Sequence, residues 1–470
     1  MHVKQKTQGP VQGILMRSKR IIIIGSGPAG LGAAHRLKEL GYENWAIYEQ
    51  ENRIGGLSSS FVDEQGFTWD IGGHVMFSAS ERFNRLADSL MGQDFLSHER
   101  ESWIRILKRW IPYPFQNNIR YLPKDRVVEC LLGLINVQHS TKEAAADFEE
   151  WIHKTFGEGI ANLFLCPYNA KVWAVPLHSM SYDWIAERVS PASIERVTRN
   201  VVMEQDDIGW GPNNKFKFPL YGGTGGFFNK FMPAVQGRIH YTKKLTSVDM
   251  DSRKVILNRG ETDDYDILIN TSPLDLFTRM IKSKYADTSC MTEAASQLKH
   301  NGIFVVGLGF RKKIAETKCW VYFPEEDVPF YRMTYFSHYS PYNVPDGDTD
   351  TYNSLMCEIS FSEYKPVDEA RVVDLTIESL IREGIITKDD SRLIVSKWLR
   401  KIDYAYPIPT LQRDDNLRVI QSFLQDNHVY SRGRFGAWLY ELGNMDHSTL
   451  MGIEIVDRIV LDEKEKLWKI

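Results

Sequence analysis

The sequence is poor in cysteine and carries little excess charge of either sign. Its 470 residues include five cysteines, which are scattered, odd in number and free of any Cys-x-x-Cys spacing. This pattern argues against a disulfide framework and a zinc site, and it favours a reducing compartment, so we expect a cytoplasmic protein. The formal net charge of −4 gives no general attraction for nucleic acid or for an anionic membrane.

Long apolar runs are also missing. No stretch approaches the ~20 apolar residues that span a bilayer, and the first nineteen residues lack the apolar core of a signal peptide. We therefore expect no membrane insertion. A hydrophobic content of 43% with 25% charged residues is typical of a globular protein, and the length indicates two or three domains or one domain with large insertions.

The clearest motif is "RIIIIGSGPAGLGAAHRL" near the start of the chain. Four isoleucines predict a buried strand, and a helix follows the glycines Gly25, Gly27 and Gly30 in G-x-G-x-x-G spacing. These glycines would allow a tight turn, close approach of a pyrophosphate, and close packing of helix on strand. Glu49 ends the next predicted strand, "WAIYEQ", where a carboxylate would accept ribose hydroxyls. Strand, helix and acid together favour a dinucleotide-binding fold over a glycine-rich turn without ligand.

Three further segments favour FAD over NAD. "RIGGLSSS" resembles the glycine pair of the glutathione-reductase-like FAD proteins, which include amine oxidases and protoporphyrinogen oxidase. "YDILINTSP" resembles a later strand of the same domain, and "GNMDHSTLMGIEIVDRI" the helix whose start reaches the flavin. The helical spacing of apolar residues in the last segment could equally be core packing alone. Fragments at both ends and in the middle imply a discontinuous FAD domain.

Two other kinds of pattern lie between these fragments. The chain from Leu122 to about Val201 reads as helical, with an apolar face at positions 128, 131, 132 and 135 and a helix stop at Gly157. From about Arg259 to Asp403 short β-rich segments such as "GIFVVGLGF" and "CWVYFP" take over. We expect an α/β plus α+β protein, in which a discontinuous Rossmann-like FAD domain carries an inserted helical domain and an antiparallel sheet domain. The expected boundaries are 18–99 with 222–258 and 420–470 for FAD binding, 122–212 for the helical substrate-binding domain, and 100–121 with 213–221 and 259–419 for the sheet domain.

Several longer motifs carry a more specific resemblance. "WIPYPFQNNI", "PYNAKVWAVP", "GWGPNNKFKFP", "CWVYFPEEDVPFYR", "YAYPIPT" and "SRGRFGAW" resemble, in order, landmarks of the UDP-galactopyranose mutase family, of the eukaryotic type. With the FAD fragments, the matches run from about Ile21 to Ile459. The resemblance implies an isomerase that interconverts UDP-galactopyranose and UDP-galactofuranose, through a covalent adduct between the sugar and N5 of reduced flavin. It further implies FAD, with NADPH or NADH as external reductant, a UDP-sugar substrate and no metal, and it leaves a homo-oligomer open.

The resemblance also implies site residues. His74, in "GGHVMFS", matches a mobile glycine–histidine loop against the flavin, and Arg188 and Arg332 match two arginines that bind the diphosphate. Taken alone, a lone histidine is more often satisfied by a backbone carbonyl, and an arginine is more often a solvated surface residue. The matched substrate-binding positions are Tyr113, Gln116, Phe164, Asn169, Trp173, Asn213, Trp320, Tyr322, Tyr339, Tyr406, Arg434, Tyr440 and Asn444. The matched cofactor-binding positions are Gly25, Gly27, Pro28, Ala29, Gly30, Glu49, Gly55, Gly56, Leu57, Gly72, Gly73, His74, Arg434, Asn444, Met445 and Ser448.

Alternatives stay open at this point. Met445 stands where fungal members carry a flavin-contacting glutamine, which puts cofactor affinity or redox tuning in question. A mutase for a related nucleotide sugar fits the same motifs. An amine-oxidase-like oxidoreductase shares the FAD fragments but has no need of "YPFQNN" or of the matched arginines. A flavoprotein that has lost catalysis would also have lost some of the matched side chains.

Overall fold

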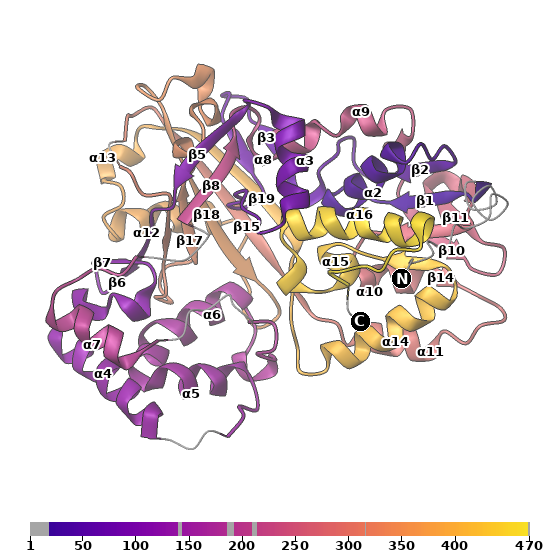
Figure 1. The fold of residues 1–470 in the computed structure, drawn as a ribbon. Helices are drawn as coiled ribbons and strands as arrows, with labels where there is room; N and C mark the ends of the chain where they lie inside the picture. Colours follow the sequence, from indigo (N-terminus) through magenta and orange to yellow (C-terminus); the bar gives the residue numbers. More distant parts are fainter. Residues whose placement is uncertain (1–17, 140–142, 186–191, 209–213, 315, 469–470) are drawn as a thin grey trace, which may run out of the picture. The chain divides into compact units, whose positions relative to one another are not determined.

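The computed structural model describes residues 18–139, 143–185, 192–208, 214–314 and 316–468. The chain divides into two compact units, each built from segments that are far apart in sequence. Unit 1 comprises Met1–Ser59, Phe228–Leu298 and Gln412–Ile470, and unit 2 comprises Ser60–Phe227 and Lys299–Leu411. The colours of Figure 1 show this alternation, with indigo and yellow segments side by side in unit 1.

A five-stranded parallel sheet forms the centre of unit 1. Its strand order is β20 (Val429–Ser431), β13 (Ile267–Asn270), β1 (Ile21–Ile24), β2 (Trp45–Tyr48) and β9 (Ile239–His240). β1 pairs with β13 and β2, and its four isoleucines are at most 5% exposed. A parallel strand covered on both faces has to be apolar throughout, as this one is.

A smaller four-stranded sheet and the helices complete unit 1. The small sheet has the order β12 (Thr262–Asp264), β11 (Lys254–Leu257), β10 (Leu245–Asp249) and β14 (Ile281–Lys282). The helices are α2 (Pro28–Glu39), α9 (Met232–Val235), α10 (Leu274–Met280), α11 (Ser289–Ser296), α14 (Arg413–Asp426), α15 (Arg434–Ala437) and α16 (Met445–Leu461).

Helices α2 and α16 touch backbone to backbone (Figure 1). A Cβ atom at Gly32 would overlap Thr449 O, and one at Gly452 would overlap Ala29 O. The small residues of "GPAGLGAA" therefore let the C-terminal helix lie directly on the first helix of the chain.

Unit 2 contains a seven-stranded sheet of mixed orientation. Its order is β19 (Ile394–Pro407), β15 (His300–Phe310), β18 (Asn353–Phe361), β17 (Arg332–Tyr335), β16 (Trp320–Tyr322), β6 (Ser102–Ile106) and β7 (Arg109–Pro112). All neighbours are antiparallel except β16 and β6, which run parallel, so the predicted antiparallel sheet is corrected at this pair. Along β15, Phe304 and Val306 join one apolar cluster while Ile303 and Val305 join another, as the period of two requires for a sheet with two buried faces.

The remaining elements of unit 2 surround this sheet. They are β3 (Ser60–Val62), β4 (Thr68–Asp70), α3 (Glu81–Met91), β5 (Phe95–Glu99), α4 (Lys124–His139), α5 (Phe148–Ile160), a π-helical turn (Ala161–Leu165), α6 (Cys166–Trp173), α7 (Ile194–Val202), β8 (Lys215–Pro219), α8 (Gly223–Asn229), α12 (Val372–Arg382) and α13 (Lys388–Ser391). Helices α4 to α7 gather in one region, as the sequence predicts (Figure 1). The division into three domains stays a prediction.

In the helical region one sequence-based expectation is wrong and another is confirmed. The apolar face expected for α4 is wrong, because Val128, Leu132 and Ile135 are 53%, 54% and 40% exposed. The buried face of α4 instead carries Val127, Cys130, Gly133 and Leu134. The helix stop predicted at Gly157 is confirmed, because Gly157 has the non-helical angles φ 71° and ψ 164° and a separate helical stretch begins after it.

Candidate active site

In unit 1, the turn between β1 and α2 has the shape of a phosphate-binding turn. Gly25 has φ +92°, and a Cβ at Gly30 would overlap Gly25 O, so strand and helix meet too closely for other residues. Gly27 caps α2 without a side-chain hydrogen bond, and no acidic residue lies in the first turn. A Cβ at Gly27 would meet only Gly56 Cα, at 3.9 Å, among the described residues. The helix start is thus open to an anion such as a dinucleotide diphosphate.

Glu49 lies beside this turn and is 6% exposed. Its Oε2 accepts hydrogen bonds from Ser26 N at 2.7 Å and Ser26 Oγ at 2.6 Å, and its Oε1 accepts one from Glu51 N at 2.9 Å. A carboxylate offers about four acceptor positions, so one remains for a ribose hydroxyl. The carboxylate is held in place by the turn that it would serve.

Two other segments with predicted cofactor residues pack onto the same turn. Gly55 N donates to Ser26 O at 2.9 Å, and a Cβ at Gly56 would lie 3.1 Å from Gly27 Cα. A Cβ at Gly433 would lie 2.8 Å from Ala29 Cβ, which brings the segment of Arg434 to the start of α2. Arg434 Nε in turn donates to Gly443 O at 2.8 Å, next to Asn444, Met445 and Ser448 in the first turn of α16. Within unit 1, these residues therefore fit a bound FAD.

In unit 2, a buried ion pair joins two neighbouring strands. Arg332 on β17 faces Glu358 on β18, with Nε to Oε1 at 2.7 Å and Nη2 to Oε2 at 2.8 Å. Burial acts to raise the pKa of the Glu358 carboxyl, but the guanidinium and a hydrogen bond from Tyr331 outweigh it, so this pKa lies below its usual value. The Glu358 side chain is 1% exposed and that of Arg332 is 21% exposed. Nη1 of Arg332 makes no hydrogen bond to the described part of the chain, which leaves one edge of the guanidinium for a ligand.

The glycine–histidine segment is tied to this pair. Gly73 N donates to Glu358 Oε1 at 3.1 Å, and Nη2 of Arg332 lies 3.5 Å from Gly73 O. A Cβ at Gly73 would meet Thr334 Oγ1 at 3.2 Å and Glu358 Oε1 at 3.4 Å. The His74 ring lies with Nδ1 3.2 Å from Gly72 O, the backbone partner typical of a lone histidine.

Arg332, Glu358 and the Gly73 backbone form a charged cluster, and tyrosines extend it. Tyr331 donates to Glu358 Oε2 at 2.7 Å, so the 3.1 Å contact between the Tyr331 and Tyr406 hydroxyls uses the Tyr406 proton. The hydroxyl of Tyr322 accepts from Trp320 Nε1 at 2.7 Å, which leaves its own proton available to a ligand. Tyr322 is also the register partner of Arg332 across β16 and β17.

Aromatic rings connect Tyr322 to the helical region. Tyr113 and Tyr168 lie 5.2 Å and 5.3 Å from Tyr322 between ring centroids. Phe164 stacks on Tyr168 at 5.2 Å and on Phe115 at 4.7 Å. The structure thus brings Tyr113, Phe164 and Tyr322 into one aromatic group suited to stacking with a flat base.

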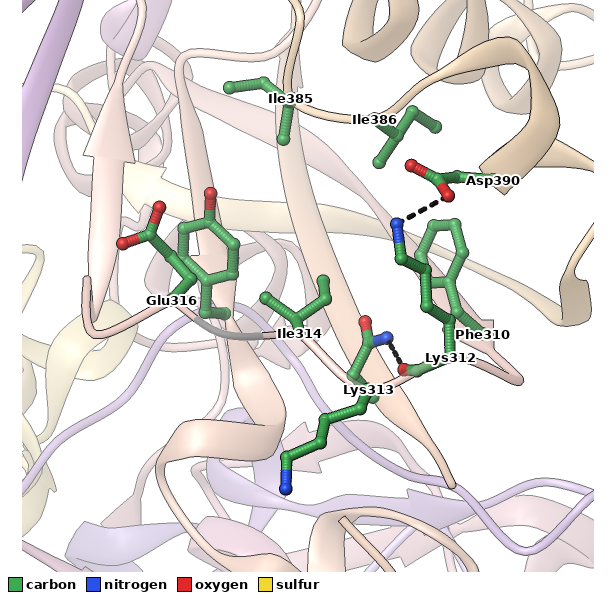
Figure 2. Close-up of a pocket in the computed structure, with 10 residues that line it drawn as sticks. Phe310, Lys312, Lys313, Ile314, Glu316, Ile385, Ile386 and Asp390 are labelled. Carbon is green, nitrogen blue, oxygen red and sulfur yellow. Dashed lines mark hydrogen bonds and ion pairs between the residues drawn. The ribbon is translucent and has the colours of Figure 1, made fainter. Parts of the chain in front are cut away.

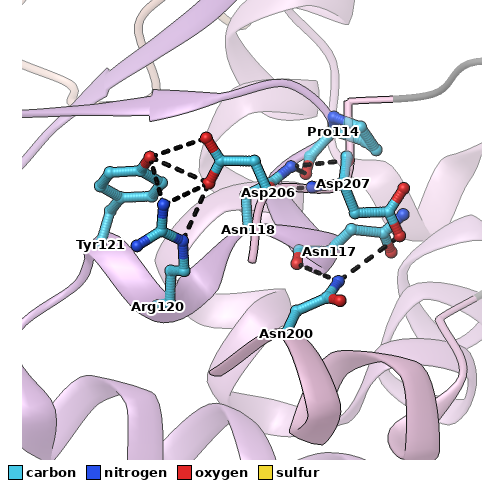
Figure 3. A network of polar contacts seen from close by, with 8 residues as sticks. All are labelled: Pro114, Asn117, Asn118, Arg120, Tyr121, Asn200, Asp206 and Asp207. Carbon is cyan, nitrogen blue, oxygen red and sulfur yellow. Dashed lines mark hydrogen bonds and ion pairs between the residues drawn. The ribbon is translucent and has the colours of Figure 1, made fainter. Parts of the chain in front are cut away.

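Asparagine side chains hold the backbone of the turn at Pro114 and Asn117, the residues that flank Phe115 and Gln116 (Figure 3). Asn118 donates to Pro114 O at 3.0 Å and to Asp207 O at 2.9 Å, and it accepts from Asp207 N at 2.9 Å. Asn200 on α7 donates to the backbone of this turn at 3.1 Å. The backbone on both sides of Gln116, at Pro114 and Asn117, is consequently held in place.

The other predicted residues take varied positions. Tyr339 is buried among aromatic rings, and its carbonyl lies 2.8 Å from His98 Nε2. Asn169 Nδ2 donates to Leu165 O, in the π-helical turn before α6, at 2.8 Å, and Trp173 packs edge-on to Tyr406 at 6.0 Å. Tyr440 lies in unit 1, in a short helical turn before α16. Arg188 and Asn213 lie outside the described residues.

Known proteins resemble the chain over most of its length. The family model described as "Flavin containing amine oxidoreductase" matches residues 28–459. The crystal structure of a reduced UDP-galactopyranose mutase is 42% identical and superimposes with a TM-score of 0.92, covering 96% of both chains. The chain belongs to the flavin-containing amine oxidoreductase family and to the UDP-galactopyranose mutase family. Its mixed α/β, amine-oxidase-like fold and an isomerase-type function are thereby supported, together with FAD as cofactor.

More distant relatives share parts of the chain or the fold alone. Protoporphyrinogen oxidase 2 of Arabidopsis thaliana is 38% identical over 177 residues, which are 35% of this chain and 34% of that protein. The chain thus matches about a third of the length of this relative. A putative protoporphyrinogen oxidase structure from Exiguobacterium is 15% identical, with a TM-score of 0.72 over 95% of this chain and 99% of that one. The first of these relatives is matched over a third of its length, and the 15% identity of the second shows likeness of fold alone.

Sequence reasoning missed several members of the cluster. Glu358 is a lone acid in the apolar strand "NSLMCEISF", and that isolation is a signal that could have marked it. Lys171 is buried on α6, between residues that the resemblance did name. Tyr331 stands next to Arg332 and offers no signal of its own.

A hollow elsewhere in unit 2 contains none of the expected residues. It lies at the end of β15, where Lys312 Nζ pairs with Asp390 at 2.6 Å and Asn353 donates to Lys312 O (Figure 2). In the described ranges no three histidine, cysteine or acidic residues group as metal ligands would. Nor does any described helix have the length and apolarity needed to cross a membrane.

Proposed function

We propose that the chain interconverts UDP-galactopyranose and UDP-galactofuranose. The observation that carries the proposal is the guanidinium of Arg332, which is locked on one edge by buried Glu358 and leaves Nη1 for an anion. A fixed, permanently charged fork of this kind suits a diphosphate. The 42% identity to a UDP-galactopyranose mutase over 96% of the chain supports the same assignment.

The nucleotide would be held by the aromatic group and the turn behind it. Tyr113 would stack on uracil and Gln116 would hydrogen-bond its edge, with Phe164, Asn169 and Trp173 on the same side. Tyr322 would donate its available proton to the diphosphate. Donation by Tyr406 would first require breaking its bond to Tyr331. Arg188 and Asn213 are proposed ligands of the same substrate, as are Trp320, Tyr339, Arg434, Tyr440 and Asn444.

The glycine turn, Glu49 and the start of α16 would hold FAD. When bound and reduced, the flavin supplies a nucleophilic N5, which a ring contraction without net redox change can use. NADPH or NADH is the proposed external reductant. The loop of Gly72, Gly73 and His74 is proposed to act on the cofactor. Its link to Glu358 through Gly73 N means that the loop and the diphosphate-binding arginine share one carboxylate.

Two alternatives are weaker. A mutase for a related nucleotide sugar would use the same contacts and differ only at the sugar. An oxidoreductase of the amine-oxidase kind would need neither the exposed edge of Arg332 nor the turn of Tyr113 and Gln116. The cytoplasmic location and a homo-oligomeric state stay predictions.

The oxidation state of the flavin tests the proposal. Oxidised protein should bind UDP without turning over, and dithionite should switch on the isomerisation of UDP-galactofuranose with no stoichiometric use of reductant. Products are separated by chromatography, with other UDP-sugars run in parallel. Turnover by fully oxidised, reductant-free protein would contradict the proposal, and an oxygen-consuming reaction would favour the oxidoreductase.

A further inference from the structure

A lysine is buried in unit 2, and none of the described residues offers its ammonium a carboxylate within hydrogen-bond distance. Lys171, on α6, is 4% exposed. Its Nζ donates to Phe323 O at 2.7 Å, Glu325 O at 2.8 Å and Phe330 O at 2.9 Å. The three N–H groups of one ammonium are therefore matched to three converging backbone carbonyls.

These carbonyls belong to the loop that joins β16 and β17. Phe323 directly follows Tyr322, and Phe330 lies two residues before Arg332. The loop is closed by Phe323 N, which donates to Tyr331 O at 3.0 Å. Anything that holds Phe323 and Phe330 in place thus holds the ends of the two strands that carry Tyr322 and Arg332.

Helix α6 is itself anchored to the sheet, so it can act as a fixed support. Asn301 Nδ2 on β15 donates to Val172 O and Trp173 O, both at 2.9 Å. Ser360 Oγ on β18 donates to Lys171 O, and Ser362 Oγ donates to Ala174 O. The last carbonyls of α6 are bonded to β15 and β18, and the Lys171 side chain adds the tie to the β16–β17 loop.

We propose that Lys171 is a positioning residue whose ammonium holds the β16–β17 loop against α6 and so places Tyr322 and Arg332 for a nucleotide diphosphate. The inference rests on the proposed function, since it concerns the same substrate. Lys171 itself would not contact the ligand, but it would position Tyr322 and Arg332, which would.

The surroundings of the ammonium make this role dependent on pH. The ionisable groups around it are Lys365, whose Nζ donates to Ser360 O at 2.6 Å, and the loop acids Glu325, Glu326 and Asp327. Burial, followed by the charge of Lys365, lowers the pKa of Lys171 to about 7. A neutral amine has two N–H groups for three carbonyls and turns a lone pair towards the third. We therefore expect the loop to loosen as the pH rises through about 7.

Fold stability should change in the opposite direction. An unfolded chain keeps the lysine proton up to the ordinary value of 10.5, so between about 7 and 10.5 it binds more protons than the folded protein. The free energy of unfolding then rises with pH across this window, as far as Lys171 contributes. A purely structural lysine would show this rise alone, whereas a positioning lysine also shows ligand affinity falling over the same range.

The test measures UDP-galactose binding to the oxidised protein from pH 6 to 9. UDP-galactose is chosen because its diphosphate diester has no ionisation near neutrality. The unmodified protein should lose affinity above about pH 7. Lys171→Met should bind roughly 10-fold or more weakly at pH 6, as for loss of one charged hydrogen-bonding group, and should lack the decline. Lys171→Gln keeps two donors without titrating, and serves if the methionine variant does not fold.

Lys365→Met is the matched control, because Lys365 is a partly buried lysine of the same sheet region, and its Nζ donates to Ser360 O. It should keep the affinity at pH 6 and move the decline to higher pH, because the charge of Lys365 lowers the pKa of Lys171. Normal binding by both Lys171 variants, or an unchanged pH profile in them, would overturn this inference alone. Failure of the unmodified protein to bind UDP-galactose at any pH would overturn the proposed function and this inference with it.

Discussion

The glycine turn between β1 and α2 in unit 1 and the charged cluster of unit 2 are built by opposite means. The turn is shaped by missing side chains, since a Cβ at Gly30 would overlap the backbone of Gly25. The cluster is shaped by large charged side chains, with Arg332 and Glu358 bonded at 2.7 Å and 2.8 Å across two strands. One site is specified by sterics and the other by electrostatics.

The difference determines how each site fails. At Gly30 of the turn an added methyl group would meet the backbone oxygen of Gly25, which cannot move aside as a flexible side chain can. In the cluster the two ions are taken out of water, and each is tolerated only because the other is present. The turn is therefore sensitive to size, and the cluster is sensitive to the loss of a partner.

Breaking the ion pair should have the largest effect. Glu358→Ala leaves the Arg332 guanidinium, the Tyr331 hydroxyl and Gly73 N without their acceptor. Removal of one partner of a buried pair costs about 3–5 kcal/mol, which urea denaturation measures as a lower midpoint. The double variant Glu358→Leu with Arg332→Met should be less destabilised than Glu358→Ala. A double variant that is the less stable of the two would mean that the pair is a net source of stability.

The sequence predicted the turn well because its rules are local. Gly25, Gly27, Gly30 and the strand before them lie within ten residues, and their spacing alone describes the backbone. The same holds for α16 and for β15, where period and length indicate the element. The face of α4 was wrong because Val128 and Val127 are equally apolar neighbours, and only the packing of α5 and α7 decides which one is buried.

The cluster was predictable only through resemblance. Arg332 and Glu358 are 26 residues apart, and their contact depends on the pairing of β17 with β18. No periodicity reports which residue of one strand faces which residue of the next. The contacts of Lys171 were still harder to predict, because its partners are backbone carbonyls 152 to 159 positions away and carry no side-chain signal.

Alanine substitutions at two glycines of the turn should distinguish an effect on folding from an effect on FAD binding. Gly30→Ala forces a Cβ onto Gly25 O. It should lower the free energy of unfolding by about 1–3 kcal/mol and should also weaken FAD binding. Gly27→Ala adds a Cβ that meets only Gly56 Cα, at 3.9 Å, among the described residues. This substitution should leave the thermal midpoint nearly unchanged. It should still weaken FAD binding, because the methyl group occupies space that the diphosphate of FAD would need. Flavin absorbance of the purified variants and titration of the apoprotein measure this. Normal FAD affinity in Gly27→Ala would place the diphosphate elsewhere.

The smallest expected effect concerns the choice of base. Gln116 is 3% exposed, and it lies on a turn whose backbone is held by Asn118. Replacement by alanine removes one neutral hydrogen bond, worth about 0.5–1.5 kcal/mol, and should narrow the affinity gap between UDP and ADP by up to roughly tenfold. Competition binding to the oxidised protein measures the gap. Asn117, 2% exposed on the same turn, supplies the comparison: Asn117→Ala should leave the gap unchanged. The measured quantity is the difference in affinity between UDP and ADP. A general loosening of the turn weakens both nucleotides and leaves this difference unchanged, whereas the loss of a contact to uracil reduces it. If Asn117→Ala narrows the affinity gap and Gln116→Ala does not, uracil is recognised by the Asn117 amide and not by Gln116.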